Sequence, residues 1–203
     1  LLERLFSLQI VHGDEYQNNY TLKIKKEKVL PSTRGNIYDR NGELLAYNEL
    51  AYSVTIEDNG TYDSLKEKNK SINDEIATIL SVLDKNGDKI ENNFNIALNE
   101  DGSYSFMLEG KSLLRFLADV YGRTRTDDLK YNKKLGYNEA EATADQVIAY
   151  LCREKGFDLS EDTYARSDLY RILVIRYAMS QNSFQKYIST TIATDVSEET
   201  VAY

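Results

Sequence analysis

Hydrophobic and polar residues alternate along two stretches in the first third of the chain. In "TLKIKKEKVL" (21–30) leucine and isoleucine alternate with lysine, and in "LAYSVTIE" (50–57) Tyr52, Val54 and Ile56 alternate with polar residues. A period of two is typical of a half-buried β-strand. The pattern therefore predicts two strands.

Asn41-Gly42 lies between these stretches, flanked by "NIYDR" and "ELLAY". Asn-Gly is the strongest short-range signal for a β-hairpin, because a two-residue type I′ turn needs a positive φ at both central positions. We therefore expect residues 34–57 to form a small antiparallel sheet.

The pattern becomes helical at about residue 72, after a polar stretch at 61–71. Ser71 and Asp74 fit a capping box, and Asn86-Gly87 fits a helix stop. Five hydrophobic residues share one face of the predicted helix: Ile72, Ile76, Ile79, Leu80 and Leu83.

A second hairpin is expected from "FNIAL" and "SYSFML", which flank residues 99–102. A helix is then expected between Gly110 and Gly122. Residues 123–142 are polar, and we expect them to be mobile.

Two more helices complete the helical part. One carries Ala144, Val147, Ile148 and Leu151 on one face. The other, from about Ser167 to Ser180, is apolar nearly all round, so we expect it at the centre of the core. The chain then returns to β-branched residues in "YISTTIATDV", which predicts a strand.

These elements together indicate an α+β fold. We expect both ends of the chain to meet in a small antiparallel β base, with a mostly helical head inserted between them. The predicted parts are a β-rich stalk at 1–60 with the hairpin, the inserted head at 61–185 and a returning strand at 186–203.

Composition excludes several classes of function. The chain has 203 residues and a net charge of -8, and only "KIKKEK" (23–28) is locally basic. No broad basic face is therefore available for phosphates, and nucleic acid is not an expected partner. No stretch approaches the ~18 consecutive apolar residues of a membrane span. The opening "LLERLFSLQIV" fits either a segment that follows an apolar anchor or an ordinary first helix.

The cysteine and histidine content gives little support for a metal site or for redox chemistry. The chain has one cysteine, Cys152, and one histidine, His12, so it contains neither a CxxC pair nor a zinc cage of His and Cys. Cys152 lies at helical spacing from Ile148, which favours a buried apolar thiol.

A serine nucleophile is suggested by "SFQK", because Ser183 and Lys186 match an SxxK signature. With 15 serines and 15 lysines in the chain, roughly one such spacing arises by chance. No SxN or K[ST]G element follows, so we do not expect Ser183 to be catalytic.

A calcium loop is suggested by "DKNGDKIENNFN", in which Asp84, Asn86 and Asp88 occupy the first, third and fifth positions. Lys89 stands where the turn needs glycine, and Asn95 stands where a glutamate is needed. A solvated helix end is the better interpretation. Two acidic pairs, 127–128 and 198–199, lie in polar runs, which indicates that they are surface residues. No cofactor is expected.

The hairpin carries more charge than its turn requires. Asp39 and Arg40 adjoin the Asn-Gly turn, and Arg34 precedes it by one strand length. One interpretation is a hairpin with a solvated charged tip. The other is that an arginine, whose planar fork holds a carboxylate in two hydrogen bonds, fixes the geometry between distant segments.

"RGNIYDRNGELLAYN" (34–48) resembles the first N-terminal motif of class B penicillin-binding proteins, RGxIxDRNGxxLAxN. "RLFSLQIVHGDEY" (4–16) is similar to the segment that leaves the membrane anchor in this family, and "YISTTIATDVSEETVA" (187–202) to the stretch before its next motif. The motif positions matched are Arg34, Gly35, Ile37, Asp39, Arg40, Asn41, Gly42, Leu45, Ala46 and Asn48.

The resemblance implies a non-catalytic pedestal, also called the dimerisation domain, on the outer face of the bacterial membrane. The parent would carry a single membrane helix and a C-terminal D,D-transpeptidase that cross-links peptidoglycan and is acylated by β-lactams. The implied partners are that transpeptidase, a membrane glycosyltransferase and other cell-wall synthesis or division proteins; a homodimer is left open.

In the family the motif helps to fix the junction between pedestal and transpeptidase. The resemblance therefore implies a charge-paired hinge of Arg34, Asp39 and Arg40, with Gly35 and Gly42 permitting the tight backbone path. Asp39 capping the turn's amides is an equal alternative. A free-standing extracytoplasmic binding or adhesion module is the other class of function that fits the sequence.

Overall fold

The computed structural model describes residues 35–47, 51–182 and 188–202. The chain divides into two units, Leu1–Glu49 and Leu50–Tyr203, called unit 1 and unit 2 below. The predicted strand at 21–30 lies outside the described residues.

Unit 1 contains a hairpin of two short antiparallel strands, β1 (Ile37–Tyr38) and β2 (Leu44–Ala46). The register changes between Ile37 and Tyr38, so that Ile37 faces Ala46 whereas Tyr38 faces Leu44. The hairpin predicted at Asn41-Gly42 is thereby confirmed.

Unit 2 begins with β3 (Tyr52–Ile56), which pairs antiparallel with β8 (Thr190–Val196). Exposure alternates along β3 and ends with Ile56 buried, as the period of two predicts. The single sheet expected over 34–57 is wrong, because β3 pairs with β8 and the hairpin strands pair with each other. The prediction that segments from both ends of the chain meet in a β base is confirmed for these two strands.

The long helix α3 (Leu65–Asn86) starts earlier than predicted. Ser64 is its N-cap and accepts a hydrogen bond from the Glu67 amide at 3.1 Å, so the capping box placed at Ser71 and Asp74 is wrong. Gly87 ends the helix with φ of 79°, which confirms the predicted stop.

The first turns of α3 were missed because two of their inward positions are polar. Asn69 and Asn73 are fully buried, and their amides donate hydrogen bonds to the carbonyls of Gly156 and Phe157, each at 2.8 Å. The NH₂ groups of both amides thus have partners, whereas the Oδ1 of Asn73 is buried without one. A polar residue at a buried position interrupts the hydrophobic period on which the prediction depends.

The next elements agree with the prediction. β4 (Ile96–Leu98) and β5 (Tyr104–Phe106) form the second hairpin, and α4 (Gly110–Val120) follows it. The turn between the strands contains Gly102, whose φ is 83°.

Residues 123–142, which we expected to be mobile, form short elements instead. These are the 3-10 helix η2 (Thr126–Asp128), the strands β6 (Tyr131–Asn132) and β7 (Tyr137–Asn138), and the 3-10 helix η3 (Glu139–Glu141). The physical reason is a buried ion pair, described below, that the hydrophobic pattern cannot reveal.

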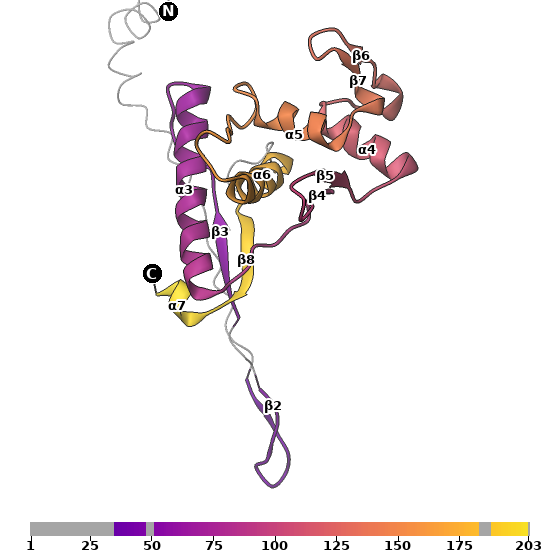
Figure 1. Cartoon of the computed structure of the whole chain (residues 1–203). Coiled ribbons are helices and arrows are strands. Elements are labelled where there is room, and N and C mark those ends of the chain that lie inside the picture. Colours follow the sequence, from indigo (N-terminus) through magenta and orange to yellow (C-terminus); the bar gives the residue numbers. More distant parts are fainter. Residues whose placement is uncertain (1–34, 48–50, 183–187, 203) are drawn as a thin grey trace, which may run out of the picture. The chain divides into compact units, whose positions relative to one another are not determined.

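Two helices complete the core. α5 (Ala144–Cys152) has a capping box in which Thr143 and Gln146 bond each other's amides, and α6 (Arg166–Gln181) packs against α3 and β8 (Figure 1). α6 contributes six buried residues to the core: Leu169, Tyr170, Ile172, Leu173, Val174 and Ile175. The predicted central position of this helix in the core is thereby confirmed.

A short last helix, α7 (Glu198–Val201), is held to the end of α3. One hydrophobic cluster joins Ile56 and Ile192 of the strand pair to the buried residues of the helices. The described residues thus form an α+β fold of helices and small antiparallel strand pairs, as predicted. The boundaries at 60 and 185 stay a prediction.

Candidate functional site: the 35–47 hairpin

The turn of the hairpin has three residues rather than two. The Gly42 amide donates to the Asp39 carbonyl at 3.1 Å, and the Asp39 amide donates to the Glu43 carbonyl at 2.8 Å. Gly42 has φ of 86°, whereas Asn41 is not among the described residues with positive φ. The predicted type I′ turn is therefore wrong, and the geometry is a type I turn followed by a left-handed glycine.

The carboxylate of Asp39 closes this turn. Its Oδ1 accepts hydrogen bonds from the amides of Asn41 at 2.7 Å and Glu43 at 2.8 Å, and its Oδ2 accepts one from the Asn41 side chain at 3.2 Å. The Glu43 amide, followed by the Asn41 amide, holds the pKa of the Asp39 carboxyl below its usual value. Of the two roles open for Asp39, turn capping is the one that these contacts show.

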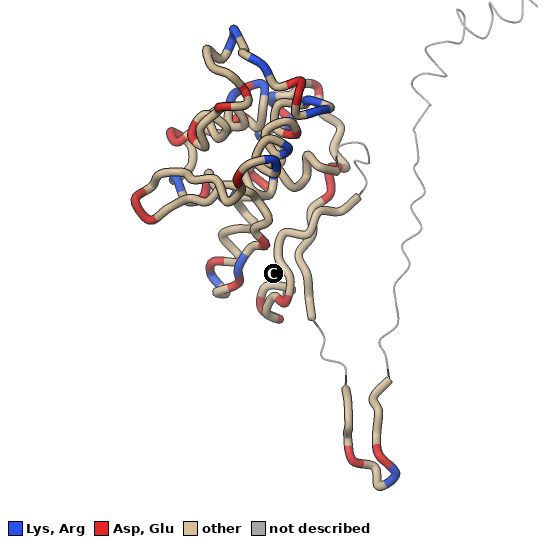
Figure 2. Tube along the Cα trace, turned by 90° about the vertical axis from the view of Figure 1, so that its right-hand side faces the viewer, with Lys and Arg blue, Asp and Glu red and all other residues tan. Residues whose placement is uncertain are grey.

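The charges of the hairpin gather at its turn, and its strands are apolar (Figure 2). Ile37 is 59% exposed and Leu45 is 67% exposed. Tyr38, Leu44 and Tyr47 are also exposed. A stiff turn thus carries side chains that are hydrophobic yet stay in water, an arrangement typical of a docking surface.

Two motif residues, Arg34 and Asn48, lie outside the described residues, so the ion pair between Arg34 and Asp39 stays a prediction. Within the described ranges, no carboxylate lies within ion-pair distance of Arg40. A Cβ at Gly35 would meet nothing within 4 Å, and its φ is not positive, so only Gly42 needs to be glycine for the backbone path.

The residues of the suggested calcium loop have other partners. Arg171 of α6 holds Asp84 in two hydrogen bonds of 2.5 and 2.8 Å. Asp88 accepts hydrogen bonds from Ser197, the N-cap of α7, and from Thr200 within α7. These contacts tie the end of α3 to α6 and α7. In the part of the chain that the structure describes, no three His, Cys, Asp or Glu residues gather in a way that would hold a metal ion.

Cys152 is half-buried at the end of α5 and packs against the hydrophobic core. Burial raises the pKa of its thiol to about 12, which keeps it protonated and unreactive at neutral pH. His12, Ser183 and Lys186 lie outside the described residues. The acidic pairs 127–128 and 198–199 are exposed, as predicted.

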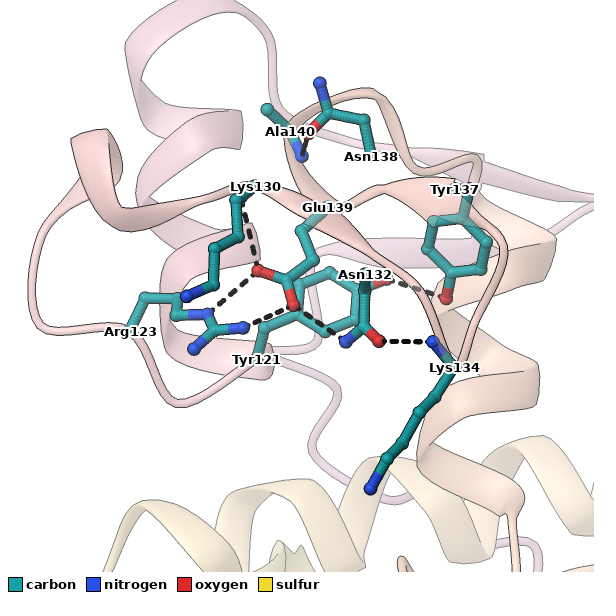
Figure 3. Close-up of polar contacts among 9 residues, drawn as sticks. All are labelled: Tyr121, Arg123, Lys130, Asn132, Lys134, Tyr137, Asn138, Glu139 and Ala140. Atoms are coloured by element: carbon teal, nitrogen blue, oxygen red, sulfur yellow. Dashed lines mark hydrogen bonds and ion pairs between the residues drawn. The ribbon is translucent and has the colours of Figure 1, made fainter.

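Sequence reasoning missed one polar cluster (Figure 3). Glu139 is 0% exposed and accepts four hydrogen bonds: from Arg123 Nε at 2.8 Å and Nη2 at 2.6 Å, from Asn132 at 3.0 Å and from the Lys130 amide at 3.4 Å. Arg123 holds the pKa of the Glu139 carboxyl below its usual value, against the effect of burial, and Glu139 raises the pKa of Arg123. Every carboxylate lone pair is used, so the cluster is structural.

Within the described ranges, none of the helices combines the length and the apolar character that crossing a membrane requires. A search of curated proteins found no match to the chain. A comparison with protein families matches residues 29–203 to the penicillin-binding protein dimerisation domain. The match includes the hairpin, both strands of the β base and the inserted helices, so the chain belongs to the penicillin-binding protein dimerisation domain family.

Proposed function

We propose that this chain is the non-catalytic pedestal of a membrane-anchored bacterial penicillin-binding protein. It positions a C-terminal D,D-transpeptidase on the outer face of the cell membrane, where that domain cross-links peptidoglycan. The family match supports a penicillin-binding protein and a cell-wall role.

The observation that carries the proposal is the chemistry of the hairpin. Asp39 and Gly42 stiffen the turn, and the strands hold Ile37 and Leu45 in water. Exposed apolar side chains lower their free energy when another surface covers them and removes them from water. These residues coincide with the RGxIxDRNGxxLAxN positions, which favours an interdomain contact with the transpeptidase.

The remaining parts have roles within the same proposal. Arg34 and Arg40 supply charges at the junction, where a carboxylate of the transpeptidase side would meet them. The β base and the inserted head present surfaces to a membrane glycosyltransferase, to other cell-wall synthesis or division proteins, or to a second copy of the domain. No nucleic acid and no cofactor takes part.

Leu45→Asp in the full-length parent tests the proposal. We expect a fluorescent penicillin still to acylate the protein, because the serine site is separate, while cell-wall assembly is impaired. Met107→Asp is the matched control, since Met107 has the same 67% exposure but lies in unit 2. Arg34→Ala should have the same effect as Leu45→Asp: acylation is retained and cell-wall assembly is impaired. Normal assembly with Leu45→Asp, or loss of acylation in a folded protein, would argue against the positioning role.

A further inference from the structure

A cavity of about 230 Å³ lies in unit 2 between α3, α6 and the pair of strands β3 and β8. Its size suits a small molecule rather than a large cofactor. Its wall is mostly hydrophobic, and Leu65, which is 51% exposed, lines it where it reaches the surface. Apolar residues from β3, α3, α6 and two connecting segments contribute: Ile56, Leu65, Ile72, Phe157, Met179 and Ile188.

Arg176 of α6 is a charged residue of this lining and is only 6% exposed. Its Nη2 donates to the side-chain oxygen of Asn69, and its guanidinium lies 5.1 Å from the centre of the Phe157 ring. Its Nε is buried and has no hydrogen-bond partner. Among the described residues, no carboxylate comes within ion-pair distance of it.

A second arginine on the same helix also has a buried Nε without a partner, but it differs from Arg176 in having anions beside it. Arg171 is bound by two carboxylates, Asp84 and Asp168. A buried guanidinium without an anion is costly, because desolvation is not repaid by an opposite charge. Burial lowers the pKa of Arg176 to about 10, so the group is still charged at neutral pH. The cavity thus holds a guanidinium whose Nε–H has no acceptor and whose charge has no anion within ion-pair distance among the described residues.

Charge balance at the cavity selects the type of anion. Lys68 and Asp58 also line it, and they form an ion pair with each other. Arg176 therefore leaves one net positive charge, which a single carboxylate neutralises. A carboxylate also matches the planar fork of arginine with two parallel hydrogen bonds. A phosphate dianion would add a second negative charge and more oxygens than this apolar wall can bond.

We propose that the cavity binds a small monocarboxylate, with its carboxylate on Arg176 and its apolar body against Ile72, Phe157 and Met179. This ligand site goes beyond the proposed pedestal function and does not depend on it.

The Nε–H resonance of Arg176 in the ¹⁵N-labelled chain reports directly on the site. We expect butyrate to shift it in a saturable way. Butyramide, which has the same shape without the charge, should bind at least about tenfold more weakly, and inorganic phosphate should also bind more weakly. Absence of a saturable shift with butyrate, equal binding of butyramide or tighter binding of phosphate would each overturn the proposal.

Variants separate the site from general charge effects. Arg176→Met should abolish butyrate binding, measured through the backbone amide of Gly156. Arg166→Met is the matched control on the same helix, because Arg166 is half exposed and pairs with Glu161 at 3.2 Å, and it should bind butyrate as the unchanged chain does. Ser180→Leu, which fills the cavity from its wall, should block binding even if Arg176→Met does not fold. Retained binding in a folded Arg176→Met or Ser180→Leu chain would refute the assignment.

Discussion

The 35–47 hairpin and residues 123–142 both carry several charged residues, but they are stabilised in different ways. In the hairpin, Asp39 bonds backbone amides two and four residues away, and the neighbouring hydrophobic side chains stay exposed. In residues 123–142, Glu139 is buried and bonds the side chain of Arg123, sixteen residues away. The number of charges in a segment therefore does not show whether it is solvated. In these two segments the difference lies in the partner of the carboxylate, which is a nearby backbone amide for Asp39 and a side chain far along the sequence for Glu139.

The largest expected effect comes from breaking the buried cluster. Glu139→Ala should lower the free energy of unfolding by about 3 kcal/mol, because it leaves Arg123 and Asn132 without their acceptor. Chemical denaturation measures this. Glu141→Ala is the control, because Glu141 is exposed in the same 3-10 helix and its loss should matter little. Similar losses for both variants would mean that the cluster is not what orders the segment.

Acid should weaken the same region. The pKa of Glu139 is lowered from the ordinary 4.5 in the folded protein, so its contribution to stability is complete above that value. The contribution is lost as pH falls through the lowered pKa, because the unfolded chain binds the proton first. Denaturation of the unchanged chain should thus show a steeper loss below about pH 4.5 than Glu139→Gln. If the stability of the two proteins fell equally with decreasing pH, protonation of Glu139 would not be a cause of the acid sensitivity.

A smaller effect is expected at the turn of the hairpin. Gly42→Ala places a Cβ at φ of 86°, which should destabilise the hairpin by about 1 kcal/mol. Gly35→Ala is the control, since its backbone is not in that region and the space around it is open. NMR contacts between the protons of Tyr38 and Leu44 measure the folded population of the hairpin. Equal populations in both variants would contradict the left-handed turn.

The smallest effect is expected from the carboxylate that caps the turn. Asp39→Ala should make the amides of Asn41 and Glu43 exchange with solvent several-fold faster, because they lose their acceptor. Asp39→Asn should behave almost like the unchanged chain, since its amide oxygen accepts the same hydrogen bonds. The stability of unit 2 should not change in either variant. Amide exchange as fast in Asp39→Asn as in Asp39→Ala would instead indicate that the charge of the carboxylate, and not its capping of the amides, is what matters.

The sequence predicted the elements whose buried faces are hydrophobic. The later turns of α3, with Ile76 and Leu80, and the whole of α5 follow a helical period, and α6 is apolar nearly all round, so the existence of these helices was predictable. The start of α3 was not, because Asn69 and Asn73 occupy its buried face. Order in residues 123–142 was not predictable either, because a fully bonded Glu139 looks like any surface glutamate until its partners are placed.

The candidate site was predictable in position but not in detail. Asn41-Gly42 located the hairpin, yet the preceding Asp39 changed the turn type. An aspartate that bonds the amide two residues ahead favours the first position of a type I turn, so the loop runs from Arg40 to Gly42. The sequence Asp39-Arg-Asn-Gly42 is therefore enough to indicate a type I turn, provided that Asp39 is considered as a turn-forming residue as well as a charged one.

The pairing of β3 with β8 constrains how unit 2 is made. A chain that leaves the ribosome from its N-terminus carries β3 for nearly the whole time of synthesis before Thr190–Val196 exists to bond it. Non-local pairing of this kind is slow and leaves an edge available to other chains in the meantime. Unit 2 therefore matures only after its final strand has been made, and products truncated ahead of that strand should aggregate instead of yielding a smaller stable domain.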